Sequence, residues 1–485
     1  MDTAASRTKP FVRDAMLPPV PPPVSEAGPI HWLRANLFSN WFNTILTLLG
    51  LLALYALVSA SLPWWLNSVW NAESLSQCRE IVADSAGEGA TGACWAMIRE
   101  RWHQFLFGFY PSELYWRPVL AFGLLFAAMA PVLYSGERRS LTILLAAVLC
   151  FVAVTMWLAA APAAAFAASL IAVAGMIGLA QTRPAMLLWF TALFPALCFW
   201  LLWGGYVWVP AGALFGFVIL AVVYSVLSRR MGPGLSAGAG IVAALLWWFL
   251  LDIPVTQALS QALPWGLVPV ASDEFGGFLL AITIGVTAIT FSLPIGILLA
   301  LGRQSDMLIV KTLCVGFIEF IRGVPLITLL FTASLLLQYF LPPGTNFDII
   351  LRVIILVTLF AAAYLAEVIR GGLAALPRGQ YEAADALGLD YWRAQRLIIL
   401  PQALKISIPA IVSTFIGLFK DTTLVAFVGL MDPLKGVTQI VRADIDWKGI
   451  YWEPYIFVGA IFFVICFGMS RYSMYLERKL KTDHR

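Results

Sequence analysis

Two long stretches without a charged residue constrain the fold of this chain most strongly. Residues 140–182 and 184–228 contain no Asp, Glu, Lys or Arg. Each stretch is long enough for two membrane-spanning helices at about 20 residues per helix. Over the whole chain 61% of residues are hydrophobic and 12% are charged, whereas soluble domains carry about 25% charged residues. The chain is therefore predicted to be an all-α integral membrane protein.

The apolar runs predict about twelve transmembrane helices, with turns at Pro162 and at Gly204-Gly205 inside the two uncharged stretches. Basic residues punctuate the runs, and Lys and Arg are enriched in cytoplasmic loops. If the basic clusters are cytoplasmic, successive loops alternate between the two sides of the membrane without contradiction. Both termini are then cytoplasmic. The expected spans outside residues 140–228 are about 44–62, 118–134, 237–251, 278–301, 310–340, 349–369, 404–427 and 454–471.

Composition divides the chain into three regions. Residues 1–40 are polar, with prolines concentrated at 18–23, and are predicted to form a disordered cytoplasmic tail. Residues 41–270 form an N-terminal transmembrane extension with a polar outer loop at about 63–117. This extension has few polar residues at membrane depth, so it is not expected to line a pathway. Residues 271–485 carry the candidate transport core.

The six cysteines fall into two groups. Four lie in apolar runs and are interpreted as small buried hydrophobic residues: Cys150, Cys198, Cys314 and Cys466. Cys78 and Cys94 lie in the outer loop, where a pair that closes a short loop can be oxidised. Two free loop thiols are the alternative.

A polar segment between two apolar runs, about residues 371–403, is predicted to form a short helix, a turn and a second helix. Gly388 would end the first helix, and Asp390 would cap the second. Pro401 would then break that second helix. Membrane proteins place loops of this kind on the cytoplasmic side as docking surfaces.

The spacing of this segment is E-A-A-x3-G-x9-I-x-L-P, from Glu382 to Pro401. It resembles the cytoplasmic-loop signature of permease subunits in ATP-binding-cassette (ABC) importers. Alanines after Glu382 would let a partner's backbone approach closely. The resemblance implies that this loop couples the permease to an ATPase, through Glu382, Ala383, Ala384, Asp385, Gly388 and Leu389.

Further segments carry the resemblance over about residues 275–480: 292–303, 319–326, 363–372 and 420–424. They are similar to the polar amino acid subfamily, whose core has five helices. The long extension, with a cysteine-bearing loop that ends near Tyr110-Pro111 and Trp116-Arg117-Pro118, resembles the general L-amino-acid branch in Gram-negative bacteria. A close relative in that branch transports acidic amino acids and their amides.

Two pairs of ionisable residues are candidates for the pathway or its gate. Glu319 and Arg322 are three residues apart and share one helical face, and Glu367 and Arg370 repeat that spacing. Charged residues at the edge of a membrane are costly and often functional. The alternative is that the arginines pin helix ends at the cytoplasmic interface, with the glutamates as counter-ions.

Lys420 and Asp421 lie inside the fourth core span. The resemblance implies a gate or an inter-subunit contact, and a plain internal ion pair is the alternative. An amino acid substrate also requires hydrogen-bonding groups, although such side chains often bond their own helix backbone. The available side chains are Thr283, Thr287, Thr328, Ser334, Gln338, Ser413 and Thr414.

The resemblance implies a permease subunit of an ATP-driven, binding-protein-dependent importer of L-amino acids in a bacterial inner membrane. A narrower importer of glutamate, aspartate and their amides is the alternative within this class. The implied partners are a second homologous permease, a cytoplasmic ABC ATPase dimer, a periplasmic amino-acid-binding protein and membrane lipid. No feature indicates nucleic acid.

Catalysis by this chain is not expected. No G-x-x-x-x-G-K-[ST] segment occurs, so ATP and Mg²⁺ would bind to the partner ATPase. The three histidines are scattered, which argues against a metal site or a His-based catalytic group. An ion-coupled secondary transporter is the alternative from another class, but residues 40–270 hold no second copy of the core and few carboxylates at membrane depth.

Overall fold

A computed structural model of the chain describes residues 28–134, 136–336, 339 and 348–480. It contains two compact units, Met1–Ala96 and Met97–Arg485, which are considered separately. Helices dominate both units. In the described residues the strands are β1 (Gly205–Tyr206) and β2 (Gly266–Leu267), which pair antiparallel.

The first unit holds helices α1 (Pro29–Asn36), α2 (Trp41–Leu66) and α3 (Leu75–Ala86). Asn40 caps α2, since its side chain accepts the backbone N–H of Asn43 at 2.8 Å. No residue of α2 is buried within the chain. A helix that is apolar on every side and uncovered by protein suits a lipid environment. Its 26 residues extend about 39 Å, enough to cross a bilayer core of about 30 Å.

The predicted disordered tail differs from the structure in its last part. Pro29–Asn36 is helical, with Pro29 in the first turn, where its missing N–H costs nothing and its fixed φ suits a helix. The proline-rich centre at 18–23 lies outside the described residues.

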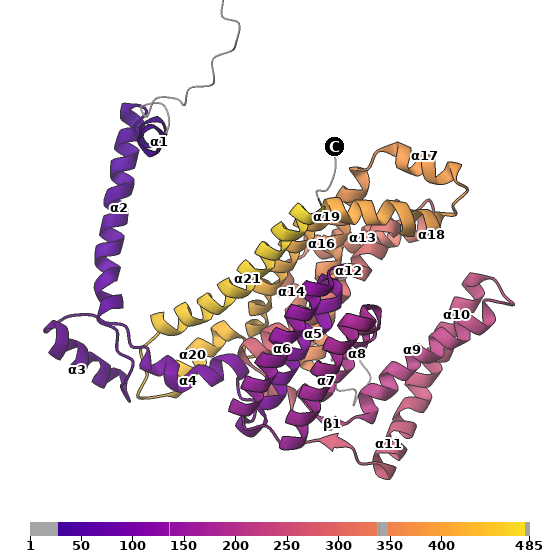
Figure 1. Ribbon diagram of the computed structural model, residues 1–485, viewed down its shortest axis with the longest axis horizontal. Coiled ribbons are helices and arrows are strands. Elements are labelled where there is room, and N and C mark those ends of the chain that lie inside the picture. The colour runs from indigo at the N-terminus through magenta and orange to yellow at the C-terminus, as the bar shows by residue number, and fades with distance from the viewer. Residues whose placement is uncertain (1–27, 135, 337–338, 340–347, 481–485) are drawn as a thin grey trace, which may run out of the picture. The chain divides into compact units, whose positions relative to one another are not determined.

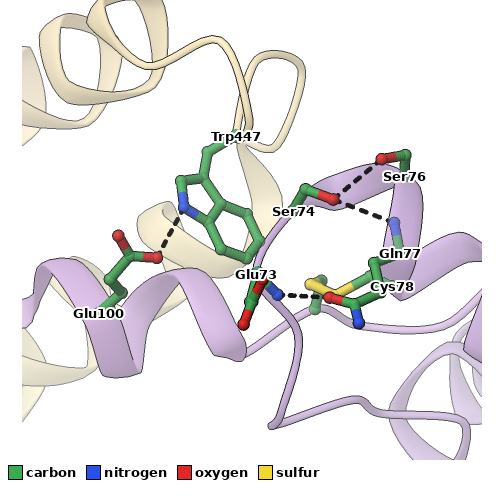
Figure 2. Close-up of a disulfide and its surroundings, with 8 residues drawn as sticks. Glu73, Ser74, Ser76, Gln77, Cys78, Glu100 and Trp447 are labelled. Atoms are coloured by element: carbon green, nitrogen blue, oxygen red, sulfur yellow. Dashed lines mark hydrogen bonds between the residues drawn. A yellow bond between two sulfur atoms is a disulfide. The ribbon is translucent and has the colours of Figure 1, made fainter.

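The polar segment that follows α2 is cross-linked. Cys78, buried in α3, forms a disulfide with Cys94, with 6.1 Å between their Cα atoms (Figure 2). Ser74 caps α3 by accepting the Gln77 N–H at 3.2 Å, and the Gln77 side chain accepts the N–H of Glu73 at 2.7 Å. The structure therefore contains the cross-link and not two free loop thiols. The four cysteines in apolar runs are free, and Cys150, which was expected to be buried, is exposed.

The second unit begins with helices that belong to the N-terminal extension. One hairpin of this region spans residues Trp208 to Ala262 (Figure 1). Its first arm is α9, and its second arm is α10, which continues through the π-helical turn η3 into α11. The predicted turns at Pro162 and at Gly204-Gly205 both occur. These elements are α4 (Ala96–Phe107), η1 (Ser112–Leu114), α5 (Trp116–Leu133), α6 (Arg138–Leu158), α7 (Ala163–Thr182), η2 (Pro184–Met186), α8 (Leu187–Trp203), α9 (Trp208–Leu227), α10 (Pro233–Leu246), η3 (Trp247–Leu251) and α11 (Asp252–Ala262).

The C-terminal half of this unit forms the core around α16, with α17 and α18 at one end and α20 at the other (Figure 1). Its elements are η4 (Ser272–Glu274), α12 (Gly277–Gln304), α13 (Leu308–Gly323), α14 (Leu326–Phe331), η5 (Thr332–Leu336), α16 (Ile349–Ala374), α17 (Arg378–Ala386), α18 (Tyr391–Ala394), η6 (Gln395–Ile399), α19 (Leu400–Asp421), η7 (Thr422–Val428), α20 (Pro433–Ala443) and α21 (Trp452–Leu480).

Small residues let α16 pack closely against its neighbours. A Cβ on Gly296 of α12 would lie 2.8 Å from the Leu365 Cβ in α16, and one on Gly372 of α16 would lie 2.6 Å from the Ala403 carbonyl oxygen in α19. Both contacts are too tight for a side chain. Helix pairs in membranes commonly use glycine in this way, because close backbone approach maximises van der Waals contact.

In the described residues, eleven helical segments are long and apolar enough to cross a membrane. Of the roughly twelve spans expected, the one at 310–340 is missing from these eleven, because the structure does not form it as a single long helix. Pro325 lacks a backbone N–H and restricts the residue before it, so α13 ends at Gly323 and α14 begins at Leu326. The predicted seventh span is longer than expected and reaches Ala262.

The extension and the core share one hydrophobic cluster. It runs from Leu120 and Leu124 in α5 to Leu280 in α12 and Val353 in α16. A polar contact adds to it: the indole N–H of Trp203 in α8 donates to the Ser272 hydroxyl at 2.8 Å. The extension is therefore packed against the core and does not form an independent bundle.

We expect the disulfide to stabilise the outer segment of the first unit. It links cysteines 16 residues apart, so replacing both with serine should lower the local free energy of unfolding by about 3 kcal/mol, because the unfolded segment gains conformational entropy. Proteolysis of residues 67–96 without reductant should then become faster. Cys150→Ser, at a free exposed cysteine, is the control and should have no effect. Rapid alkylation of both cysteines in untreated protein would contradict the cross-link.

Candidate functional site

Helix α17 ends in a hydrogen-bonded stop that explains the spacing E-A-A-x3-G. The N–H of Gly388 donates to the Asp385 carbonyl at 2.9 Å, and the N–H of Leu389 donates to the Ala384 carbonyl at 3.2 Å. Gly388 has a φ of +70°, which glycine adopts without steric strain. These bonds form a Schellman motif, with the glycine immediately after the helix cap. The glycine therefore fixes where the chain turns.

The predicted coupling residues do not all face outward. Ala384 is buried within this chain, whereas Glu382, Ala383 and Asp385 are exposed. The expectation that both alanines offer room to a partner therefore does not fit Ala384. That residue faces inward at the position where the Schellman motif places its hydrophobic contact.

An exposed leucine lies beside these polar residues. Leu387 closes the last turn of α17 and is 73% exposed. Trp392 and Leu397, on the following segment, are 65% and 63% exposed. Leu387 lies outside the apolar helical spans, where an exposed apolar side chain indicates a contact surface, whereas Trp392 and Leu397 lie near the start of the Tyr391–Val428 span. The sequence motif does not include Leu387, although its position directly before the turn glycine is a usable signal.

Short polar contacts hold α17 and α18 on the end of α19. Gln402 of α19 donates to the side chain of Gln380 in α17 at 2.9 Å. Asp390 caps α18 as predicted, since it accepts the N–H of Arg393 at 3.0 Å. Tyr381 packs against the core beneath α17, and this burial raises the pKa of its hydroxyl. The second predicted helix extends through the π-helical turn η6 into α19, so Pro401 lies in the first turn of α19 and does not break it.

A network of charges joins three core helices near α17. Glu367 of α16 accepts from Arg370 on the same helix, with 2.9 Å between Nε and Oε1. Its Oε2 lies 3.2 Å from Arg303 of α12 and 3.7 Å from Arg322 of α13. Arg303 also lies 2.9 Å from Glu319 of α13. The Glu367 carboxylate thus lies within ion-pair distance of three guanidinium groups, and it ties α12, α13 and α16 together.

The structure contains the expected Glu367–Arg370 pair but not the Glu319–Arg322 pair. Glu319 and Arg322 share a helix, but each pairs with a different helix. Arg303, which the sequence analysis did not select as a site residue, joins both glutamates. Pairing across helices cannot be derived from spacing within one helix. In the residues that the structure describes, no group of three or more His, Cys, Asp or Glu is arranged to hold a metal ion.

Comparison with known proteins identifies the family. Residues 292–482 match the family described as the binding-protein-dependent transport system inner membrane component. The glutamate/glutamine/aspartate/asparagine transport system permease protein BztC of Rhodobacter capsulatus is 62% identical over 98% of this chain and 99% of its own length. This chain is an amino acid ABC importer permease. The inner membrane amino-acid ABC transporter permease protein YhdY of Escherichia coli is 35% identical over 96% of each chain.

The family confirms the transport function expected from the loop motif. The permease is not itself an enzyme, because a separate ATPase subunit supplies ATP hydrolysis in this family. An ion-coupled secondary transporter is thereby excluded.

Shorter relatives match only part of the permease. The glutamate/aspartate import permease protein GltK of Escherichia coli is 32% identical over 44% of this chain and 96% of its own length. A crystal structure of an amino acid ABC transporter with histidines aligns at 31% identity over 41% of this chain and 91% of that chain, with a TM-score of 0.37. A relative such as GltK is complete without a region as long as the extension.

Lys420 and Asp421 of the permease end α19 and lie apart from the charge network. Among the described residues no ion pair within 4.0 Å joins their side chains. The internal pair considered as an alternative is therefore not formed. Several hydroxyl candidates bond their own helix: Thr283, Thr287 and Thr414 each donate to the carbonyl four residues earlier. Gln338 lies outside the described residues.

Gly388→Ala should destabilise the end of α17. An added Cβ has open space, so the cost is backbone strain of about 1–2 kcal/mol at a positive φ. Asparagine tolerates this conformation better, and Gly388→Asn should cost less. The matched control is Gly379→Ala, which also has open space but no positive φ and should be neutral or stabilising by up to about 1 kcal/mol. Hydrogen exchange at Leu389 measures the effect; equal protection in Gly388→Ala and Gly379→Ala would argue against the strained turn.

Glu367→Gln should destabilise the permease more than Glu319→Gln. The first change leaves three arginines without their shared counter-charge, at an estimated cost of about 2 kcal/mol for a partly buried group. Glu319 is 53% exposed and has one partner, so its loss should cost about 0.5 kcal/mol. Thermal unfolding in detergent or nanodiscs measures both, and equal melting temperatures would contradict a central role for Glu367.

Proposed function

We propose that this permease imports glutamate, glutamine, aspartate and asparagine. The observation that carries this proposal is the 62% identity to the Rhodobacter capsulatus permease named for those four amino acids, which extends over 98% of this chain. A similarity that includes the extension as well as the core favours the narrower substrate class. Uptake of many unrelated L-amino acids is the competing outcome of the test.

The transport complex would combine this permease with a second homologous permease, a cytoplasmic ABC ATPase dimer and a periplasmic amino-acid-binding protein. ATP and Mg²⁺ would bind to the ATPase. Glu382, Ala383, Asp385 and Leu387 form the exposed surface of α17 and its turn, and this surface would occupy a groove on the ATPase. Ala384, Gly388 and Leu389 would give that surface its shape.

Closure of the ATPase would then move α17 together with the helices attached to it. Gln380 and Gln402 link α17 to α19. The charge network around Glu367 links α16 to α12 and α13. We assign Glu319, Arg322, Glu367 and Arg370 to a structural clamp at the inner end of the pathway. Such a clamp would let the core rock as a unit between two states that ATP and loaded binding protein favour differently.

Both termini would lie in the cytoplasm, with the eleven helical spans and the broken α13–α14 segment as twelve crossings. Contacts within the second unit agree with the sides assigned to its loops, because they join segments assigned to the same side. Lys479 lies 3.3 Å from Glu137, both near the cytoplasmic face, and Arg101 lies 2.6 Å from Asp444, both near the outer face. In this arrangement residues 1–40 precede the membrane, 41–270 form the extension, 271–485 form the core, and Lys420 and Asp421 would contact the second permease or the gate.

The decisive test is ATP-dependent uptake of radiolabelled amino acids by proteoliposomes that contain the complete complex. We expect unlabelled glutamate, glutamine, aspartate and asparagine to reduce uptake of radiolabelled glutamate. Unlabelled leucine and histidine should leave that uptake unchanged. Competition by all six would favour a general importer. Uptake that needs neither ATP nor an ATPase would contradict the assignment.

The coupling surface is tested in the same preparation. Leu387→Asp and Glu382→Lys should lower co-purification of the ATPase and reduce uptake at least about tenfold, since each places an unfavourable charge in a contact surface. Glu73→Lys, the same charge change at an exposed residue of the first unit, is the matched control. Unchanged co-purification in both α17 variants would exclude α17 as the docking helix.

A further inference from the structure

Arg352 is a buried arginine near the start of α16. Its side chain is 9% exposed, and one guanidinium nitrogen, Nη1, donates to the backbone carbonyl of Ser334 at 2.7 Å. Its Nε is buried and has no hydrogen-bond partner among the described residues. Ser334 belongs to η5, a π-helical turn, and such turns occur frequently at functional sites.

Within the part of the chain that the structure describes, Arg352 forms no ion pair. In residues 28–134, 136–336, 339 and 348–480, no carboxylate lies within 4.0 Å of the Arg352 guanidinium. The neighbouring acid, Asp348, caps α16 and accepts the N–H groups of Ile350 and Leu351. The sequence from 337 to 347 contains no Asp or Glu, so that segment has no carboxylate to offer.

The other buried arginine in the described chain, Arg117, also has a carbonyl acceptor and a buried Nε without a partner, but it lies in another part of the fold. It lies in α5, outside the matched permease core, and donates to the Val268 carbonyl at 2.6 Å. Its guanidinium lies 5.7 Å from the ring centre of Trp116. Arg117 thus links α5 to the segment after β2 within the extension, whereas Arg352 belongs to the central helix of the core.

A buried, uncompensated guanidinium is expensive near the membrane and indicates a missing anion. Arginine binds carboxylates through two parallel hydrogen bonds, which a planar guanidinium with several free donors provides. Arg352 and Glu367 are separated by roughly 22 Å along α16, at 1.5 Å per residue. With α17 on the cytoplasmic side, Arg352 lies near the outer end, where a substrate delivered from the periplasm enters first.

We propose that Arg352 binds a carboxylate of the imported amino acid at the outer end of the permease core. This inference rests on the proposed import of acidic amino acids and their amides. Ser334 holds the guanidinium through its backbone carbonyl and leaves the remaining donors for the substrate. The carboxylate can be the α-carboxylate, which every amino acid substrate carries, or the side-chain carboxylate, which glutamate has and glutamine lacks.

The test compares Arg352→Gln and Arg352→Lys with wild type in the complete complex, with radiolabelled L-glutamate and L-glutamine. We expect Arg352→Gln to lower uptake by about 30-fold or more, as for loss of a buried hydrogen-bonded charge, and Arg352→Lys to recover part of it. Loss of both substrates would identify the α-carboxylate, and loss of glutamate alone the side-chain carboxylate. Arg230→Gln, at an exposed arginine between α9 and α10, should transport like wild type.

A purely structural role gives a different result. It would lower the melting temperature, the assembly of the complex and the basal ATPase activity of both variants together with uptake, and this outcome would overturn the proposal. Uptake of both amino acids by Arg352→Gln at the wild-type rate would also overturn it while leaving the proposed function intact. A wild-type complex that imports neither amino acid would contradict the proposed function itself.

Discussion

The close packing of α16 against α12 and α19 is the constraint on which the rest of the core depends. Gly296 and Gly372 permit backbone contacts that any side chain would prevent. In a bilayer, lipid competes for apolar surface as well as another helix does, so close packing and interhelical polar contacts supply much of the association free energy. A helix fixed in this way can carry charged groups at defined positions relative to its neighbours.

Those charges lie toward the two ends of α16 and serve different purposes. Toward the C-terminal end of α16, Glu367 pairs with three arginines, and Glu319 supplies a second carboxylate to Arg303, so the cluster ties the helices together. Near the N-terminal end of α16, Arg352 has a carbonyl partner but no carboxylate among the described residues. The contrast separates a structural charge cluster from a position that is complete only when an anion is bound.

The extension packs against the half of the core that holds the start of α16. Its α5 residues share one hydrophobic cluster with α12 and the first turns of α16, whereas the C-terminal half of α16 belongs to a second cluster with α19. Relatives of about half this length lack room for such an extension. The hairpin from α9 to α11 leaves most of its large apolar side chains exposed, which suits contact with lipid.

Sequence alone determined the features that depend on local order along the chain. Uncharged runs predicted the helices, Pro162 and Gly204-Gly205 predicted turns, and Gly388 and Asp390 predicted a helix stop and a cap that the structure contains. Only the tertiary structure decided which charges meet, that Ala384 faces inward while Leu387 is exposed, and that Arg352 has no carboxylate partner among the described residues. Helical periodicity defines neighbours three or four residues apart, whereas these contacts depend on how separate helices cross.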